Sequence, residues 1–204
     1  MTSAPLPSSV AGTTTQEVDY FRADHVLLAN WFADSDEAWS VLDPEWTSLQ
    51  DAAASLTPAA PISRYAFVEL GGWTLMLNNG PNGTDVGILP SYAARESGCR
   101  AVRAVYVADD DPGYAARIFE VYGPDTDSPL ALRRSVGAAN DGGRWVFETS
   151  GPPFAFEDLA AYRRRRRSDR LSGVMVHHYL RQLGVPVDTE PAWNSAVLVE
   201  RRDS

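Results

Sequence analysis

The feature that most constrains the fold is a pair of short apolar runs joined by two glycines. Residues 64–70 read RYAFVEL and residues 73–78 read WTLMLN, with Gly71 and Gly72 between them. Both runs are rich in aromatic and branched side chains, which favour strands. Two consecutive glycines suit a two-residue hairpin turn, whose central residues need positive φ angles. The sequence therefore predicts a β-hairpin in this region.

Further strand patterns follow this hairpin along the chain. Residues 99–107 alternate apolar residues with arginines, as a half-buried strand does. Residues 116–123 and 130–136 predict a second hairpin, and residues 142–151 and 195–201 predict further strands. Neighbouring strands joined by such short loops pair in antiparallel fashion.

Helical patterns flank the strands on both sides. Val26, Leu27 and Trp31 fall on one helical face, and Asp34 or Ser35 is placed to cap a second helix that runs through residues 39–42. Residues 46–56 continue the helical pattern. The N-terminal part of the chain is therefore expected to be helical.

Helix signals return after the strands. Glu157 and Asp158 suit the first turn of a helix that contains the arginine run, and Ser172 is placed to cap a last helix that ends near Gly184. The predicted fold class is α+β: an antiparallel sheet of about five to six strands, with N-terminal and C-terminal helices packed on one face. A disordered tail over residues 1–15 precedes a single domain over residues 16–204.

Charge is distributed unevenly along the chain. The formal net charge is −9. Residues 1–60 carry nine acidic residues and one arginine, whereas residues 161–204 carry nine arginines and five acidic residues. An acidic protein repels the phosphate backbone, so we expect no nucleic-acid partner. No apolar run approaches the roughly 18 residues that a membrane span needs, and the N-terminus lacks a secretory signal, so a cytoplasmic location is expected.

Five consecutive arginines, Arg163–Arg167, stand out against this acidic background. On a helix they would cover its whole circumference, so Arg163 or Arg166 would lean inward and need a carboxylate or carbonyl partner. One interpretation is a solvated helix whose charge is balanced by acids of the same domain. The other is a site for an anion or an acidic partner, with Arg163, Arg166 and Arg167 as its contacts.

Candidate catalytic residues are few and scattered. His177 and His178 are adjacent, so on a helix they point about 100° apart and cannot share a metal ion. Asp141 and Arg144 flank a tight turn, and together with a histidine they could act on an anionic substrate in a cleft between the sheet and the C-terminal helices. This enzyme hypothesis is the alternative to a binding function.

No cofactor or metal site is predicted. The chain has one cysteine, Cys99, which we expect to be a small buried residue, and it has no lysine for a phosphate-binding loop. Residues 78–87 contain several glycines and asparagines but lack a dinucleotide-binding context. Asp109, Asp110 and Asp111 lack the alternating ligand spacing of a calcium loop.

Residues 67–107 contain a Gly-Trp-Thr strand, an Asn-Gly loop and a short helix. This block resembles the core of small, uncharacterised actinobacterial α+β proteins, and the resemblance covers about residues 60 to 150. Such proteins are discussed beside toxin-immunity and defence proteins. The resemblance implies an immunity-like role and carries no catalytic residues with it.

The leading hypothesis is a non-catalytic binding protein of immunity or regulatory type. Its N-terminal region offers an acidic docking face for a basic protein partner, since opposite charge speeds encounter. The residues expected on this face are Asp34, Asp36, Glu37, Asp43 and Glu45. A third possibility is an oligomer-forming protein with an exposed apolar patch around Trp31, Trp39 and Trp46.

Overall fold

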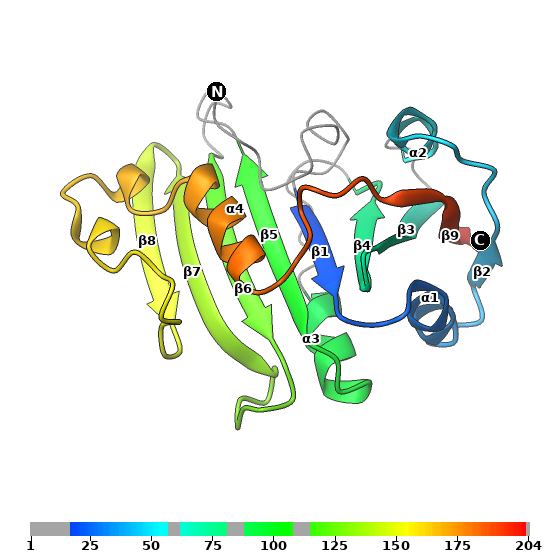
Figure 1. The fold of residues 1–204 in the computed structure, drawn as a ribbon, viewed down its shortest axis with the longest axis horizontal. Helices are drawn as coiled ribbons and strands as arrows, with labels where there is room; N and C mark the ends of the chain where they lie inside the picture. The colour runs from blue at the N-terminus through cyan, green and yellow to red at the C-terminus, as the bar shows by residue number, and fades with distance from the viewer. Residues whose placement is uncertain (1–16, 57–61, 81–87, 108–114, 203–204) are drawn as a thin grey trace.

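The structure is a computed structural model that describes residues 17–56, 62–80, 88–107 and 115–202. The predicted tail over residues 1–15, the aspartates 109–111 and most of the predicted Asn-Gly loop lie outside the described residues. Within them, nine strands form one antiparallel sheet in the order β2-β9-β3-β4-β1-β5-β6-β7-β8 (Figure 1). The strands are β1 (Glu17–Phe21), β2 (Trp39–Leu42), β3 (Ile62–Leu70), β4 (Trp73–Asn78), β5 (Ala101–Val107), β6 (Ala116–Tyr122), β7 (Leu132–Asp141), β8 (Arg144–Ser150) and β9 (Ala192–Arg202).

The chain is α+β, but the prediction of five to six strands is wrong. Two of the additional strands, β1 and β2, come from the N-terminal region that the sequence pattern predicted as helix. β1 lies in the centre of the sheet between β4 and β5. β2 is short and pairs only with β9, which arrives from the other end of the chain. Local periodicity does not encode such long-range pairing.

Four α-helices occur in the described part of the chain, and three of them, α1, α2 and α4, begin after a residue whose side chain caps the helix. Asp24 caps α1 by accepting hydrogen bonds from the N–H groups of Val26 and Leu27. Ser172 caps the last helix in the same way, as the sequence predicted. The helices are α1 (His25–Ala33), α2 (Leu49–Ser55), α3 (Ile88–Glu96) and α4 (Gly173–Gln182).

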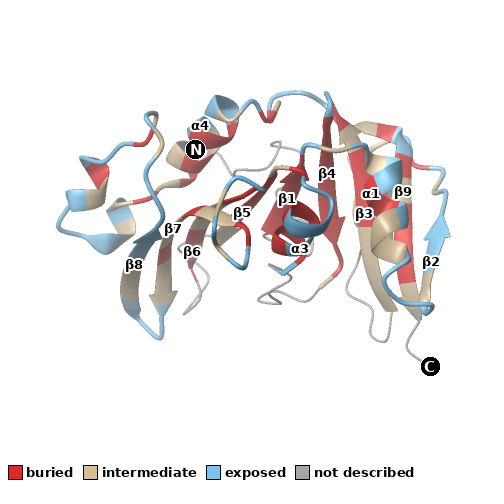
Figure 2. Ribbon diagram, turned by 90° about the horizontal axis from the view of Figure 1, so that it is seen from below, coloured by how far each residue is buried: buried red, intermediate tan, exposed pale blue. Residues whose placement is uncertain are grey.

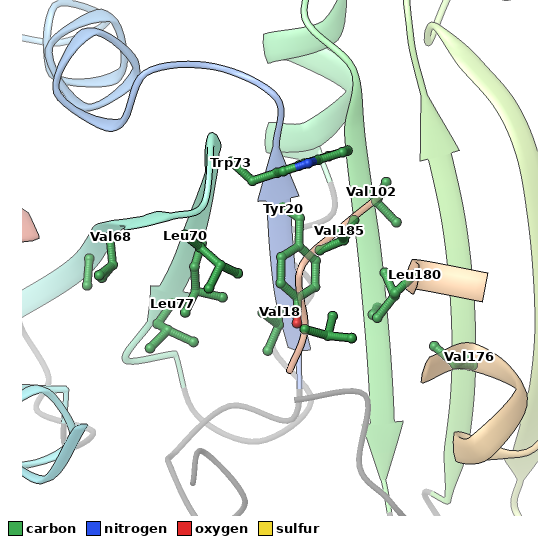
Figure 3. Close-up of a cluster of buried hydrophobic side chains, with 14 of the residues drawn as sticks. Val18, Tyr20, Val68, Leu70, Trp73, Leu77, Val102, Val176, Leu180 and Val185 are labelled. Atoms are coloured by element: carbon green, nitrogen blue, oxygen red, sulfur yellow. The ribbon is translucent and has the colours of Figure 1, made fainter. Parts of the chain in front are cut away.

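The helices cover both faces of the sheet, whereas the sequence predicted one covered face. Neighbouring residues of β1 show this directly, since successive side chains of a strand point to opposite faces. Tyr20 is buried in a cluster with Val176 and Leu180 of α4, and Phe21 is buried in a second cluster with residues of α1 and α3. Figure 3 shows the first cluster, in which Tyr20 and Val102 of the sheet face Leu180 of α4.

The predicted hairpins are confirmed. β3 and β4 pair in register through Leu70 and Trp73, and both intervening glycines have positive φ angles, 54° for Gly71 and 81° for Gly72. β6 and β7 form the second predicted hairpin. β2 and β8 form the two opposite edges of the sheet (Figure 1).

Candidate functional site

The predicted acidic face lies around β2, at one edge of the sheet. Asp34 ends α1, the pair Asp36 and Glu37 precedes β2, and Asp43 and Glu45 follow it. All five residues are exposed. The fold therefore brings these predicted partner-binding acids together at one edge, where Figure 2 shows β2 as exposed.

Most of these carboxylates form no hydrogen bond or ion pair with the described residues. Asp36 bonds the backbone N–H of Ala38 and forms an ion pair with Arg201, with 3.2 Å between Asp36 Oδ2 and Arg201 Nη2. The carboxylates of Glu37, Asp43 and Glu45 contact no hydrogen-bond donor or cation within the described ranges. Negative charge at this edge is therefore left available to a partner.

The strand between these acids has apolar side chains that are unusually exposed. Val41 is 45% and Leu42 is 42% exposed, because β2 is the outermost strand and has a neighbour only on the β9 side. An edge strand presents backbone N–H and C=O groups that pair with no other strand of the sheet. This edge thus combines backbone hydrogen-bonding groups, apolar surface and negative charge.

The arginine run lies at the opposite edge and is not an α-helix. Two 3-10 turns, at Ala161–Arg163 and Arg167–Asp169, are joined by extended backbone, so the predicted helix is wrong. The side chain of Glu157, which was predicted to begin that helix, is instead fully buried against Arg134. That pair holds Glu157 against β7, so its carboxylate is not placed at the first turn of a solvated helix.

All five arginines of the run are exposed. Arg164 donates to the backbone carbonyl of Asp169 at 2.8 Å, and Arg167 donates to that of Trp145 in β8 at 3.1 Å. The guanidinium groups of Arg163, Arg165 and Arg166 contact no carboxylate within the described segments. The expected inward-leaning Arg163 or Arg166 is therefore not found, and this positive charge is not balanced by acids of the N-terminal helices.

A buried cluster anchors the segment before the arginine run. Arg134 of β7 donates to both carboxylate oxygens of Glu157, with Nη2 and Oε2 2.6 Å apart. Tyr162 donates to Glu157 Oε2 at 2.9 Å, and its hydroxyl lies 3.1 Å from that of Tyr179. Burial, and then the contact with Tyr179, raise the pKa of Tyr162 above its usual value. All these groups are satisfied by one another, which indicates a structural role.

A second buried network, which the sequence pattern did not predict, crosses the centre of the sheet. Arg103 of β5 donates to Glu17 of β1 and to Glu120 of β6, each at 2.9 Å. Tyr122 donates to Glu120 at 2.8 Å. Burial alone would lower the pKa of Arg103, but the hydrogen bonds and charges of Glu17 and Glu120 raise it. If residues 17–21 had been predicted as a strand beside residues 101–107, the sequence would have indicated that Arg103 lies between two acids, Glu17 and Glu120.

The candidate catalytic residues do not form a shared site. Asp141 and Arg144 face each other in register at the exposed β7–β8 turn. His177 lies on α4 and contacts Asp188, with 3.2 Å between Nε2 and Oδ1. No contact joins the turn residues to His177 or to the exposed His178 in the described part of the molecule.

Asp188 is engaged mainly by Arg181. The distances are 2.5 Å from Arg181 Nε to Oδ2 and 2.6 Å from Arg181 Nη2 to Oδ1. The hydrogen bond from Arg181 holds the pKa of Asp188 below its usual range. His177 therefore contacts an aspartate that already forms an exposed ion pair with Arg181.

The remaining sequence candidates have structural positions. Cys99 is buried, as expected, and burial raises the pKa of its thiol. Trp46 is buried, and Trp31 and Trp39 are half-buried, so these three side chains do not form an exposed apolar patch. Among the described residues, no group of three or more His, Cys, Asp or Glu side chains could hold a metal ion. No described helix is both long and apolar enough to cross a membrane.

No protein-family model, curated protein or solved structure matches this chain. The partner-binding residues predicted from sequence divide into two groups, acids around β2 and arginines near β8, at opposite edges of the sheet (Figure 1).

Proposed function

We propose that this chain is a non-catalytic cytoplasmic binding protein of immunity or regulatory type, which takes a basic protein partner along β2. The observation that carries this proposal is an exposed edge strand with carboxylates at both ends, Glu37 before it and Asp43 and Glu45 after it, that form no hydrogen bond or ion pair with the described residues. The resemblance to actinobacterial proteins discussed beside immunity proteins points to the same kind of role.

The edge suits a partner that adds a strand to the sheet. Main-chain hydrogen bonds to an edge strand supply affinity, and side-chain contacts supply specificity. Val41 and Leu42 offer apolar contacts on opposite faces of the strand. The surrounding carboxylates attract a basic segment and speed its encounter.

The same charges argue against pairing between two copies of this chain at β2. Antiparallel pairing of two β2 strands would bring the acids of one copy close to those of the other. Like charges placed opposite each other destabilise a sheet, and charged edges are a common protection against self-association. A basic strand or loop is therefore the preferred occupant.

The proposal is tested by capture from cells of the source organism with the purified protein as bait. A triple variant, Glu37→Gln, Asp43→Asn and Glu45→Gln, removes three exposed carboxylates that make no described contact. We expect wild-type protein to retain a basic partner at about 50 mM salt and to release it at about 500 mM, because salt screens exposed charges. The triple variant should bind the purified partner at least about tenfold more weakly at low salt.

A matched variant provides the control. Asp127→Asn, Asp141→Asn and Glu148→Gln neutralise three exposed acids away from β2 and change the net charge equally. This control should bind like wild type. Equal losses of binding in both variants would show that binding depends on net charge alone. Undiminished binding of the partner by the β2 variant would contradict the proposed site.

A further inference from the structure

The arginine run contains a short extended segment with free backbone groups. Arg164 has φ and ψ angles of −57° and 149°, and Arg166 has angles of −79° and 125°, both in the extended region. The N–H and C=O groups of Arg165, which lies between them, form no hydrogen bond with the described part of the chain. This segment therefore keeps backbone groups that can pair with a strand of another molecule.

Contacts within the chain hold this segment in its shape. Arg164 Nη1 donates to the carbonyl oxygen of Asp169 at 2.8 Å, and Arg170 Nε donates to that of Arg164 at 2.8 Å. Arg167 Nη1 donates to the carbonyl oxygen of Trp145 at 3.1 Å, which ties the run to β8. A segment that is already ordered loses less conformational entropy when it binds.

The other three arginines of the run are available to a partner. Arg163, Arg165 and Arg166 are exposed, and their guanidinium groups form no hydrogen bond or ion pair with the described residues. The guanidinium group matches the geometry of a carboxylate, with which it forms strong paired hydrogen bonds. The run therefore suits a surface that combines exposed carboxylates with an open strand edge.

The edge at β2 is such a surface. No described strand pairs with the outer side of β2, and Glu37, Asp43 and Glu45 surround it with negative charge. β2 and β8 lie at opposite ends of a nine-stranded sheet (Figure 1). With about 4.8 Å between neighbouring strands, the two edges are roughly 38 Å apart along the sheet. The run of one copy therefore does not reach its own β2, but it can reach that of a second copy.

We propose that this chain associates head to tail, with the arginine run of one copy lying along β2 of the next. The inference rests on the proposed binding at β2, and it names the basic segment as one that a second copy supplies. This contact differs from the pairing of two β2 strands, because it places arginines opposite carboxylates. Each contact leaves one run and one β2 free, so the assembly continues as an open chain or closes into a ring.

The net charge of −9 opposes this association only at long range. At about 0.15 M salt the screening length is about 8 Å, so acids far from the contact repel each other weakly. Arginines and carboxylates in direct contact still attract at this distance scale. At about 1 M salt the screening length falls to about 3 Å, and we expect the association to be lost.

The test is sedimentation equilibrium of the full chain at several protein concentrations and about 0.15 M salt. The average mass of the wild type should rise above that of one chain as the concentration increases. A run variant carries Arg163→Glu, Arg165→Glu and Arg166→Glu, and an edge variant carries Glu37→Arg, Asp43→Arg and Glu45→Arg. Each variant alone places like charges opposite each other, so it should associate at least about tenfold more weakly.

Mixing the two variants tests the head-to-tail geometry. The unaltered run of the edge variant then meets the unaltered β2 of the run variant, so the mixture should associate again. A control variant, Arg22→Glu, Arg95→Glu and Arg181→Glu, changes three exposed arginines outside the run and alters the net charge as the run variant does. It should keep most of the association.

Three results would overturn the inference: a wild type with the mass of one chain at every concentration, a mixture that does not associate, or equal losses in the run and control variants. A wild type that stays monomeric but captures a basic partner through β2 would overturn only this inference and leave the proposed function standing. The proposed function fails separately, if neutralising Glu37, Asp43 and Glu45 leaves partner binding undiminished.

Discussion

The two edges of the sheet are both charged, but they use their charges differently. At β8, Arg167 donates to the carbonyl oxygen of Trp145, and the guanidinium of Arg170 lies 5.4 Å from the centre of the Phe147 ring. At β2, the carboxylates of Glu37 and Asp43 form no hydrogen bond or ion pair with the described parts of the chain. The β8 edge is thus partly covered by its own chain, whereas no described strand pairs with the outer side of β2.

This difference separates structural charge from available charge. The segment beside β8 is held by the buried pair Arg134–Glu157, whose side chains are 4% and 0% exposed. The ion pair nearest β2, Asp36–Arg201, has side chains that are each 42% exposed. A buried pair determines where a segment lies, and an exposed pair adds little to stability. The position of the arginine run is therefore set by the buried Arg134–Glu157 pair. The acids around β2 are less conspicuous in the sequence, but they are the better candidate for binding a partner.

The largest expected effect is at this anchor. Glu157→Gln leaves the Arg134 guanidinium buried without its counter-charge, which should lower the free energy of unfolding by about 3–5 kcal/mol. The measurement is urea unfolding monitored by tryptophan fluorescence. Asp36→Asn is the matched change near β2 and should cost no more than about 1 kcal/mol. If the two variants lower the free energy of unfolding by similar amounts, the charges at the two edges do not differ in their structural role.

A second effect concerns the turn that leads away from β8. Gly151 has a φ angle of 77°, and a Cβ there would lie 2.0 Å from the carbonyl oxygen of Arg133. Gly151→Ala should therefore destabilise the fold by roughly 2–5 kcal/mol, from backbone strain and overlap together. Gly142→Ala, at the β7–β8 turn, has φ of 58° and open space around the new methyl group, so it should cost about 1–2 kcal/mol. Equal losses on urea unfolding would show that the overlap at Gly151 is relieved by movement.

A smaller effect concerns acid stability near the β2 end. The backbone N–H of Thr47, and then the hydroxyls of Thr47 and Ser48, lower the pKa of Asp51 below its usual value of 3.8. Ionised Asp51 therefore stabilises the fold at neutral pH, and this contribution disappears as the pH falls below the unfolded-state value toward the lower folded-state value. Asp51→Asn should lower the urea midpoint at about pH 7 more than at about pH 2.5. A pH-independent difference, such as that expected for Asp127→Asn, would contradict this role.

The sequence predicted those parts of the fold in which the decisive signals are local. Gly71 and Gly72 marked a hairpin, and Ser172 marked the start of α4, because turn and cap residues act on their immediate neighbours. β1 was missed because Glu17 and Asp19 look like surface residues. Glu17 is buried on the central strand of the sheet, where Arg103, 86 residues away, pairs with it.

The same limit applies to the candidate site. The acids around β2 were predicted as a docking face, because the clustering of acidic residues in the N-terminal region is visible in the sequence. That they flank an edge strand was not predictable, since the position of β2 depends on pairing with β9 at the far end of the chain.

The most direct test of the open β2 edge uses a labelled protein and a simple basic strand. A capped hexapeptide of alternating arginine and valine is titrated into ¹⁵N-labelled protein, with a proline-containing version as the control that cannot extend a sheet. We predict that shifts and hydrogen-exchange protection concentrate in residues 39–42, weaken as salt increases, and are absent with the proline peptide. Shifts centred on β8, or binding that neither salt nor proline affects, would contradict the account.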